Sequence, residues 1–287
     1  MLTIYAPAKI NIVLEVLGKS NNRHRVMSIL QTINLCDILK FRLTEGVSFT
    51  CNEPSLQHGN IIEKAARLLK EDSHSSKGVY IELYKNIPWG AGLGGGSSDA
   101  ASTLLALNKL WSLGLTTSGL TQLADKLGSD VTFFLHGGTA LVEGEGEKVT
   151  PLVPLSPTYF ILLMPPIPKV EHKTKQLYNN LISSRFTNGE FVSKALQNLL
   201  QERMIPGHLM FNAFEETAFS FFPGLTEYKQ AFQDAGAASV HLAGSGPCLY
   251  TINSNEQQAG HLCSTLRNAG LKSYVARSLP LTNTAYH

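Results

Sequence analysis

The stretch Pro88-Trp-Gly-Ala-Gly-Leu-Gly-Gly-Gly-Ser-Ser-Asp99 carries the most information about this chain. Five of the seven residues from 90 to 96 are glycine, so backbone N–H groups can close around an anion without interference from side chains. The apolar run that follows, residues 100–107, is typical of a buried helix, with Ser98 or Asp99 as its expected N-cap. A glycine-rich loop that leads into a helix N-terminus predicts a phosphate-binding site.

Three well-known nucleotide loops do not explain this stretch. A Walker loop ends in Gly-Lys-Ser/Thr, and no lysine occurs here. Gly90, Gly92 and Gly95 match the dinucleotide pattern G-x-G-x-x-G, but residues 111–117, where its acidic residue should end a strand, are typical of a loop. The H-R-D and D-F-G motifs of protein kinases are missing from the sequence. A flexible linker is disfavoured because linkers rarely end in a buried helix. A phosphate loop of another family remains.

Composition limits the remaining function classes. The 287 residues suffice for one large or two medium domains, and the net charge of +2 favours neither nucleic acid nor an anionic membrane as a partner. The longest apolar run, residues 159–164, is far shorter than the ~20 residues of a membrane span. The four cysteines lack C-x-x-C spacing, and no signal or transit peptide is recognised. We expect reduced thiols in a cytoplasmic protein; the sequence leaves the oligomeric state open.

The order of expected elements predicts an α+β fold in two domains. Three prolines between residues 151 and 157 suggest a boundary there, which gives an N-terminal domain of residues 1–153 and a C-terminal domain of residues 154–287. Alternating or continuous apolar residues predict strands, and helical periodicity predicts helices between them. The expected strands are 9–16, 79–84, 159–164, 239–243, 248–252 and 271–276; the expected helices are 61–71, 98–110, 118–127, 173–182, 191–201, 225–235 and 255–268.

Polar residues in three other segments are candidates for chemistry. Lys9 and Asn11 share the face of a strand opposite Ile10 and Ile12, which fits either a polar pocket or a solvated face. Asp130 follows a helix end and precedes an apolar run, so it is either a helix cap or a carboxylate that accepts a proton from a substrate hydroxyl. The turn at Gly244-Ser245 could be a tight hairpin or part of a site.

Together these segments resemble the GHMP family of small-molecule kinases. Three motifs of that family match in order: Ala-Pro-Ala-Lys-Ile-Asn at residues 6–11, the loop at 88–98, and Ala-Gly-Ser-Gly at 243–246. The resemblance implies two α+β domains with ATP and acceptor between them. It also implies Asp130 as general base, Lys9 as its support, and Mg²⁺ bridging the phosphate oxygens with few protein ligands. The residues that would hold ATP are Pro88, Trp89, Gly90, Ala91, Gly92, Leu93, Gly94, Gly95, Gly96, Ser97 and Ser98.

The sequence is most similar to the branch of this family whose acceptor is cytidine diphosphate-linked methylerythritol. The spelling of the glycine loop, Gly-Ser-Asp-Val-x-Phe-Phe at 128–134 and Asn-Ala-Phe-Glu at 212–215 support this branch. The resemblance implies Asn11, Gly244 and Ser245 as contacts to that acceptor.

Residues 21–25 depart from the pattern of this branch, which has Asp-Gly-Tyr-His-Glu there to hold the cytosine. His24 matches, but Arg23 stands in place of the tyrosine; a guanidinium can also stack on a base. Tyr178 is the candidate for a second aromatic contact to the cytosine. Two alternatives stay open: another GHMP kinase, acting on mevalonate, homoserine or a sugar, and a nucleotide-binding regulator without turnover.

Overall fold

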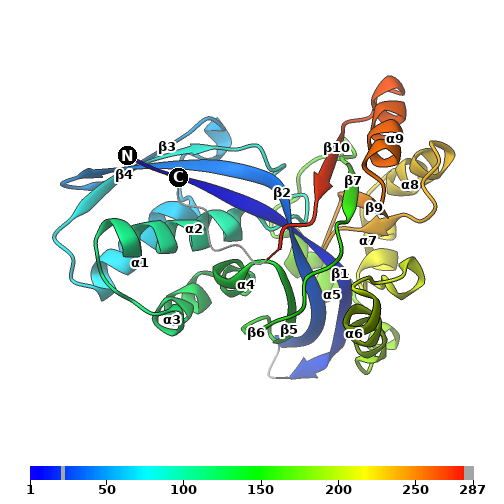
Figure 1. The fold of residues 1–287 in the computed structure, drawn as a ribbon, viewed down its shortest axis with the longest axis horizontal. Coiled ribbons are helices and arrows are strands. Elements are labelled where there is room, and N and C mark those ends of the chain that lie inside the picture. The colour runs from blue at the N-terminus through cyan, green and yellow to red at the C-terminus, as the bar shows by residue number, and fades with distance from the viewer. Residues whose placement is uncertain (21–22, 281–287) are drawn as a thin grey trace.

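Two long paired strands, β1 (Leu2–Ser20) and β2 (Arg23–Thr44), organise the N-terminal half of the structure, which is a computed structural model. It describes residues 1–20 and 23–280, so Asn21 and Asn22 of the segment discussed above lie outside the described residues. The pairing register of β1 shifts at three places, including one between Asn11 and Val13. Such irregularities bend a strand, and Figure 1 shows β1 and β2 running from the N-terminal sheet toward the C-terminal half.

The first sheet has the order β3-β4-β2-β5-β6, with β1 paired to β2. Its four shorter strands are β3 (Val47–Cys51), β4 (Gly78–Tyr84), β5 (Thr139–Gly144) and β6 (Lys148–Pro151). Three helices pack on it: α1 (Ile61–Asp72), α2 (Gly95–Leu110) and α4 (Val131–His136). The fourth helix of this half, α3 (Thr117–Leu127), packs on those three helices. Helix α2 is the most enclosed of them, because its small residues lie in the apolar core between the sheet and its neighbouring helices.

The start of α2 corrects one expectation. Ser98 and Asp99 are not its N-cap: the helix begins at Gly95, and Gly94 precedes it with φ +71°. The left-handed backbone of Gly94 turns the loop directly into the helix, a conformation that costs glycine little. Ser98 and Asp99 are therefore buried inside the helix rather than at its end.

The second sheet has the order β10-β7-β9-β8. Its strands are β7 (Tyr159–Leu163), β8 (His241–Leu242), β9 (Leu249–Asn253) and β10 (Ser273–Arg277). The helices of this half are α5 (Lys173–Asn180), α6 (Glu190–Glu202), α7 (Glu215–Phe221), α8 (Leu225–Asp234) and α9 (Glu256–Asn268). The expected α+β class is confirmed. The domain limits 1–153 and 154–287 stay a prediction; they fall between β6 and β7.

Strand β1 also joins the two halves. Leu14 exchanges backbone hydrogen bonds with residues of the C-terminal half, through Phe211 O at 2.7 Å and Ala213 N at 2.9 Å. Ile10 and Ile12 pack in one core with Phe160 and Tyr250 of the second sheet. Residues on β1 therefore face elements of both halves. Over the described residues, no helix has the length and apolarity needed to cross a membrane.

Candidate active site

A cleft of about 490 Å³ lies where β1, the glycine loop and α5 meet. It brings together Lys9 and Asn11 from β1, Asp130 from the α3–α4 connection, and Gly244 and Ser245 from the β8–β9 turn. The predicted loop residues that line it are Gly90, Gly92, Gly94, Gly95, Gly96 and Ser97. Pro88, Trp89, Ala91 and Leu93 do not line this cleft but lie on the other side of the loop, and Ser98 is buried in α2.

Lys9 and Asp130 form the charged centre of the cleft. The Lys9 ammonium lies 3.6 Å from Asp130 Oδ2 and also donates to Asn11 Oδ1. Lys9 and Asn11 are only 4% and 7% exposed, so the solvated-face alternative is wrong. The Asp130 side chain is 41% exposed. Asp130 does occupy the N-cap position of α4, but its side chain makes no capping hydrogen bond. Its carboxylate is thus available on the cleft side.

Ser28 on β2 supports this pair, and sequence reasoning missed it. Asn11 Nδ2 donates to Ser28 Oγ at 3.0 Å, and Ser28 Oγ donates to Val13 O at 2.6 Å. This chain orients the Asn11 amide so that its oxygen faces Lys9. A single serine in a mostly apolar strand gives no signal of that role, because the contact depends on the pairing of β1 with β2.

The glycine loop is held tightly between β1 and the β8–β9 turn. Gly90, Gly92 and Gly94 have positive φ angles. A Cβ on Gly92 would lie 2.0 Å from Ala243 O, and one on Gly94 would lie 2.9 Å from Lys9 Cγ. The Lys9 backbone N–H also donates to Leu93 O at 2.9 Å. A Cβ on Gly96, in contrast, would have Ile61 Cγ2 as its nearest neighbour, at 3.9 Å. The loop therefore opens toward the cleft at Gly96.

The turn between β8 and β9 is a hairpin that also forms part of the cleft wall. Asn212 Nδ2 donates to Leu242 O at 2.9 Å and to Gly244 O at 2.8 Å. The Ser245 hydroxyl lies 2.9 Å from the Thr174 hydroxyl on α5. The segment is therefore a tight hairpin and at the same time lines the cleft, so the two alternatives stated for it do not exclude each other.

Lys173, at the start of α5, is a second buried lysine near the cleft that sequence reasoning missed. Its ammonium donates to Gly90 O at 2.8 Å and to Gly246 O, and so connects the glycine loop to the β8–β9 turn. Burial, together with the charge of Lys9, lowers the pKa of Lys173 to about 7. The sequence shows only a lysine at the start of a polar helix, which is normally exposed.

A buried ionic cluster fixes the segment that leads into the loop. Lys85 pairs with Asp37 and with Asp99, the latter at 2.9 Å. Asp37 Oδ1 also accepts from the backbone N–H groups of Asn86 at 2.6 Å and Ile87 at 2.8 Å. Burial raises the pKa of Asp99, and the Lys85 charge opposes that shift. Asp99 therefore helps to anchor the loop instead of capping α2.

Of the three residues expected to contact the cytosine, Tyr178 lines the cleft, whereas Arg23 and His24 do not. His24 stacks on Tyr178 with ring centroids 4.6 Å apart, and the Tyr178 ring meets Phe214 edge-on at 4.7 Å. Tyr178 lines the cleft, and burial, aided by the charge of Asp130, raises the pKa of its hydroxyl. The Arg23 guanidinium is exposed and pairs with Glu145. No base fits between the His24 and Tyr178 rings at their present separation, and of these two residues Tyr178 is the one that lines the cleft.

A smaller cavity of about 300 Å³ lies on the other side of the loop. Its wall includes Asn60 and Ile61 at the start of α1, Lys85, and residues 88–96. Glycines of the loop line both this cavity and the active-site cleft. A ligand whose phosphates lie on the loop could place an apolar group there.

Comparisons with known proteins identify the family. The model described as GHMP kinases N terminal domain matches residues 60–138, and GHMP kinases C terminal matches residues 193–272. Together they cover more than half of the chain, which belongs to the GHMP kinase family of ATP-dependent small-molecule kinases. Its fold also resembles that of a homoserine kinase from Cytophaga hutchinsonii, with a TM-score of 0.75 at 22% identity over 100% of this chain and 97% of that one.

Full-length relatives of this chain share one name. A 4-diphosphocytidyl-2-C-methyl-D-erythritol kinase from Dehalococcoides mccartyi is 40% identical over 281 residues, 97% of this chain and 99% of the relative. The enzyme of the same name from Pelotomaculum thermopropionicum is 34% identical over 97% of this chain and 98% of its own length. A crystal structure of 4-(cytidine 5'-diphospho)-2C-methyl-D-erythritol kinase superposes with a TM-score of 0.82 at 31% identity, covering 96% of this chain and 98% of that one.

Proposed function

We propose that this chain transfers the γ-phosphoryl group of ATP to the 2-hydroxyl of 4-diphosphocytidyl-2-C-methyl-D-erythritol, in non-mevalonate isoprenoid precursor biosynthesis. The observation that carries the proposal is the position of the Lys9–Asp130 pair opposite the glycine loop in one cleft. The full-length relatives of that name support the choice of acceptor. We further propose a cytoplasmic location, which the four free cysteines support.

We assign catalytic, ATP-binding and acceptor-binding roles to different residues. Asp130 accepts the proton of the acceptor hydroxyl, and the Lys9 ammonium, 3.6 Å away, orients that carboxylate. Residues Pro88–Ser98 bind ATP: N–H groups of the loop and the first turn of α2 bind its phosphates, and the cavity beside Asn60 takes its base. Asn11, Gly244 and Ser245 hold the acceptor beside Asp130.

Magnesium would enter the site with the nucleotide. The described residues contain no group of three or more His, Cys, Asp or Glu side chains that could hold a metal ion. Ser97 and Asp130 are two of the side chains with oxygen atoms in the cleft, and they fit an ion held mainly by phosphate oxygens and water. When bound, the ion neutralises charge on the transferred phosphoryl group.

We assign the other end of the cleft to the cytosine. Tyr178 provides a stacking face and His24 backs that ring. The exposed Arg23 pairs with Glu145, which lines the cleft. Stacking on an aromatic ring and contacts to the edge of the base would make the cytidine diphosphate group the main determinant of acceptor choice.

A coupled assay of ADP release tests the proposal. The purified protein is offered the cytidine-linked acceptor, and in parallel mevalonate, homoserine and a hexose. We expect turnover with the cytidine-linked acceptor alone. Turnover with one of the other alcohols instead would reassign the acceptor within the family. ATP binding without any turnover would mean that the chain is a nucleotide-binding regulator.

A further inference from the structure

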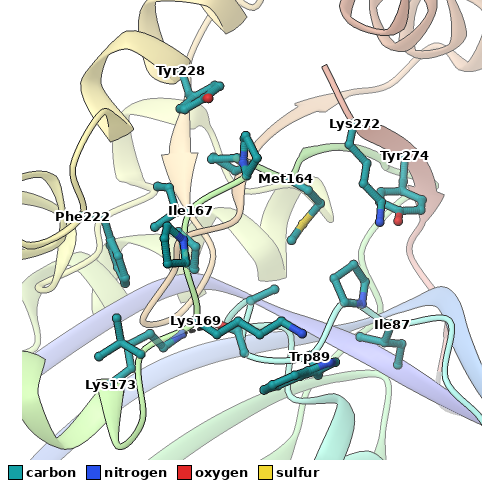
Figure 2. A pocket seen from close by; sticks show the side chains of 18 of the residues that line it. Ile87, Trp89, Met164, Ile167, Lys169, Lys173, Phe222, Tyr228, Lys272 and Tyr274 are labelled. Atoms are coloured by element: carbon teal, nitrogen blue, oxygen red, sulfur yellow. Dashed lines mark hydrogen bonds between the residues drawn. The ribbon is translucent and has the colours of Figure 1, made fainter. Parts of the chain in front are cut away.

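A further cavity lies next to the active-site cleft and shares Gly90 and Lys173 with it. It encloses about 530 Å³ between residues 86–91 before and within the glycine loop, the β7–α5 connection at 164–170, and residues 270–274 (Figure 2). Three prolines, Pro165, Pro166 and Pro168, form part of its wall. Proline fixes the φ angle of the backbone, so this wall is already in shape without a ligand.

Apolar and cationic side chains together line the cavity. Met164, Ile167 and Phe222 contribute apolar surface, and Lys169 and Lys272 reach the cavity from two different segments, beside Trp89 and Tyr274 respectively (Figure 2). Both lysine residues are exposed at the rim, while Phe222 is buried. Such a division between an apolar interior and a charged rim fits a ligand that has an apolar body and an anionic group.

The two rim lysines have no close carboxylate partner. The Lys169 ammonium lies over the Trp89 ring, and that of Lys272 lies 5.9 Å from the centre of the Tyr274 ring. Neither lies within 4.0 Å of a carboxylate oxygen of the described residues, and the only acidic residue in the lining is Glu53. Partial burial and the charge of Lys272 lower the pKa of Lys169, against the influence of Glu53. An anion between the two ammonium groups would relieve their mutual repulsion.

We propose that this cavity is a second ligand site, for an organic phosphate with an apolar body, beside the sites for ATP and the acceptor. It shares Pro88, Trp89 and Ala91 with the cavity assigned to the base of ATP. The phosphate lies between Lys169 and Lys272, and the apolar body lies against Met164, Ile167 and Phe222. Gly90 and Lys173 line both this cavity and the active-site cleft. A ligand bound in this cavity therefore contacts the outer side of the glycine loop. Such a ligand changes the affinity of the protein for ATP.

The fluorescence of Trp89 reports binding directly. The chain has two tryptophans, and Trp111 is 3% exposed in the N-terminal core, so Trp111→Phe leaves Trp89 as the single reporter. The Trp111→Phe protein, saturated with ADP to fill the nucleotide site, is titrated with n-octyl phosphate, inorganic phosphate or n-octanol. We expect n-octyl phosphate to bind at least about tenfold more tightly than either fragment.

Charge-removing variants locate the site. In the same protein, Lys169→Met with Lys272→Met should weaken n-octyl phosphate binding at least about tenfold and leave the unfolding temperature and ADP binding intact. The matched control removes two exposed charges elsewhere, Lys126→Met with Lys194→Met, and should not change binding. Four results would each overturn the proposal. Trp89 does not respond to millimolar n-octyl phosphate, or a fragment binds as tightly as n-octyl phosphate. Alternatively, the two double variants bind n-octyl phosphate equally, or n-octyl phosphate competes with ADP.

Discussion

The Lys9 ammonium and the Asp130 carboxylate lie 3.6 Å apart, although they come from opposite ends of the N-terminal half of the chain. Lys9 donates to Asn11, which in turn donates to Ser28, whereas the Asp130 carboxylate accepts no hydrogen bond from the described residues. The pair therefore consists of a fixed cation and an accessible carboxylate. This arrangement suits a base that must receive a proton from a bound hydroxyl.

Asp130→Asn should lower kcat by ~10²–10⁴ because an amide cannot accept the hydroxyl proton. The affinity for ATP should change little, and the fold should persist, since the Asp130 side chain caps no helix. Steady-state kinetics by ADP release, with ATP binding by calorimetry, measure both effects. Asp125→Asn is the matched control: Asp125 accepts a hydrogen bond from Thr132 at 2.8 Å and does not line the cleft. Equal kcat in the two variants would contradict the assignment of Asp130.

Gly96→Val should weaken ATP binding at least about tenfold (about 1.4 kcal/mol), since its side chain would enter the space proposed for the phosphates. Valine has a better helix propensity than glycine, and a Cβ here would meet nothing closer than 3.9 Å, so stability should not fall. Gly94→Val is a poorer test, because strain at φ +71° and the contact with Lys9 would disturb the structure itself.

Gly260→Val in α9 is the matched control for the loop variant. A Cβ at Gly260 also has open space around it, and α9 is remote from the cleft. Calorimetric titration with ATP should separate the two variants. Unchanged ATP affinity in Gly96→Val would remove the open part of the loop from the phosphate site.

Tyr178→Ala should raise KM for the cytidine-linked acceptor by an amount that corresponds to ~1–3 kcal/mol, the usual value of a stacked base. His24→Ala should act in the same direction, because His24 stacks on the Tyr178 ring. KM for ATP should stay the same in both. Tyr178→Phe keeps the ring and serves as the control.

The acceptor without its cytidine, methylerythritol 4-phosphate, should be discriminated against by up to ~10⁴ in kcat/KM. The proposed contacts to the edge of the base would then be missing. Comparable kcat/KM values for the cytidine-linked and cytidine-free acceptors would rule out the specific acceptor and leave only the family assignment.

Lys173 should make stability depend on pH in the alkaline range. Its pKa is about 7 in the folded chain against a usual value of 10.5, so between these values the unfolded chain binds a proton that the folded chain has released. The contribution of Lys173 to the free energy of unfolding therefore rises with pH, by up to about 1.4 kcal/mol per pH unit. Urea unfolding of the wild type and Lys173→Met from pH 6 to pH 10 measures it. A constant difference between the two proteins would mean that Lys173 keeps its ordinary pKa.

Lys85→Met should destabilise the fold by about 3–5 kcal/mol, because it leaves the buried Asp37 and Asp99 without their cation. Lys64→Met on the exposed side of α1 should stay within about 0.5 kcal/mol of the wild type. Urea unfolding at neutral pH gives both values. A loss for Lys85→Met no larger than that of the control would show that the cluster does not stabilise the start of the loop.

Local sequence determined the class of site and most of the elements. The glycine loop requires positive φ at Gly90, Gly92 and Gly94, a demand that is visible in the residue types themselves. Apolar periodicity located the helices that became α1 and α3 within a residue or two, because their amphipathic faces are set by neighbours in sequence. Identity of the motif residues in order then indicated the family.

Tertiary structure alone decided which polar groups meet. Lys85 pairs with Asp37 and Asp99, and Asn11 donates to Ser28. Lys173 donates to the carbonyl oxygens of Gly90 and Gly246. The residues of each contact are distant in sequence. No periodicity or local propensity encodes such contacts, since they arise only when β1 pairs with β2 and the C-terminal half packs against the loop. Asp99 illustrates the difference: locally it has the properties of a helix cap, but the fold buries it beside Lys85, where neutralising a buried cation outweighs capping.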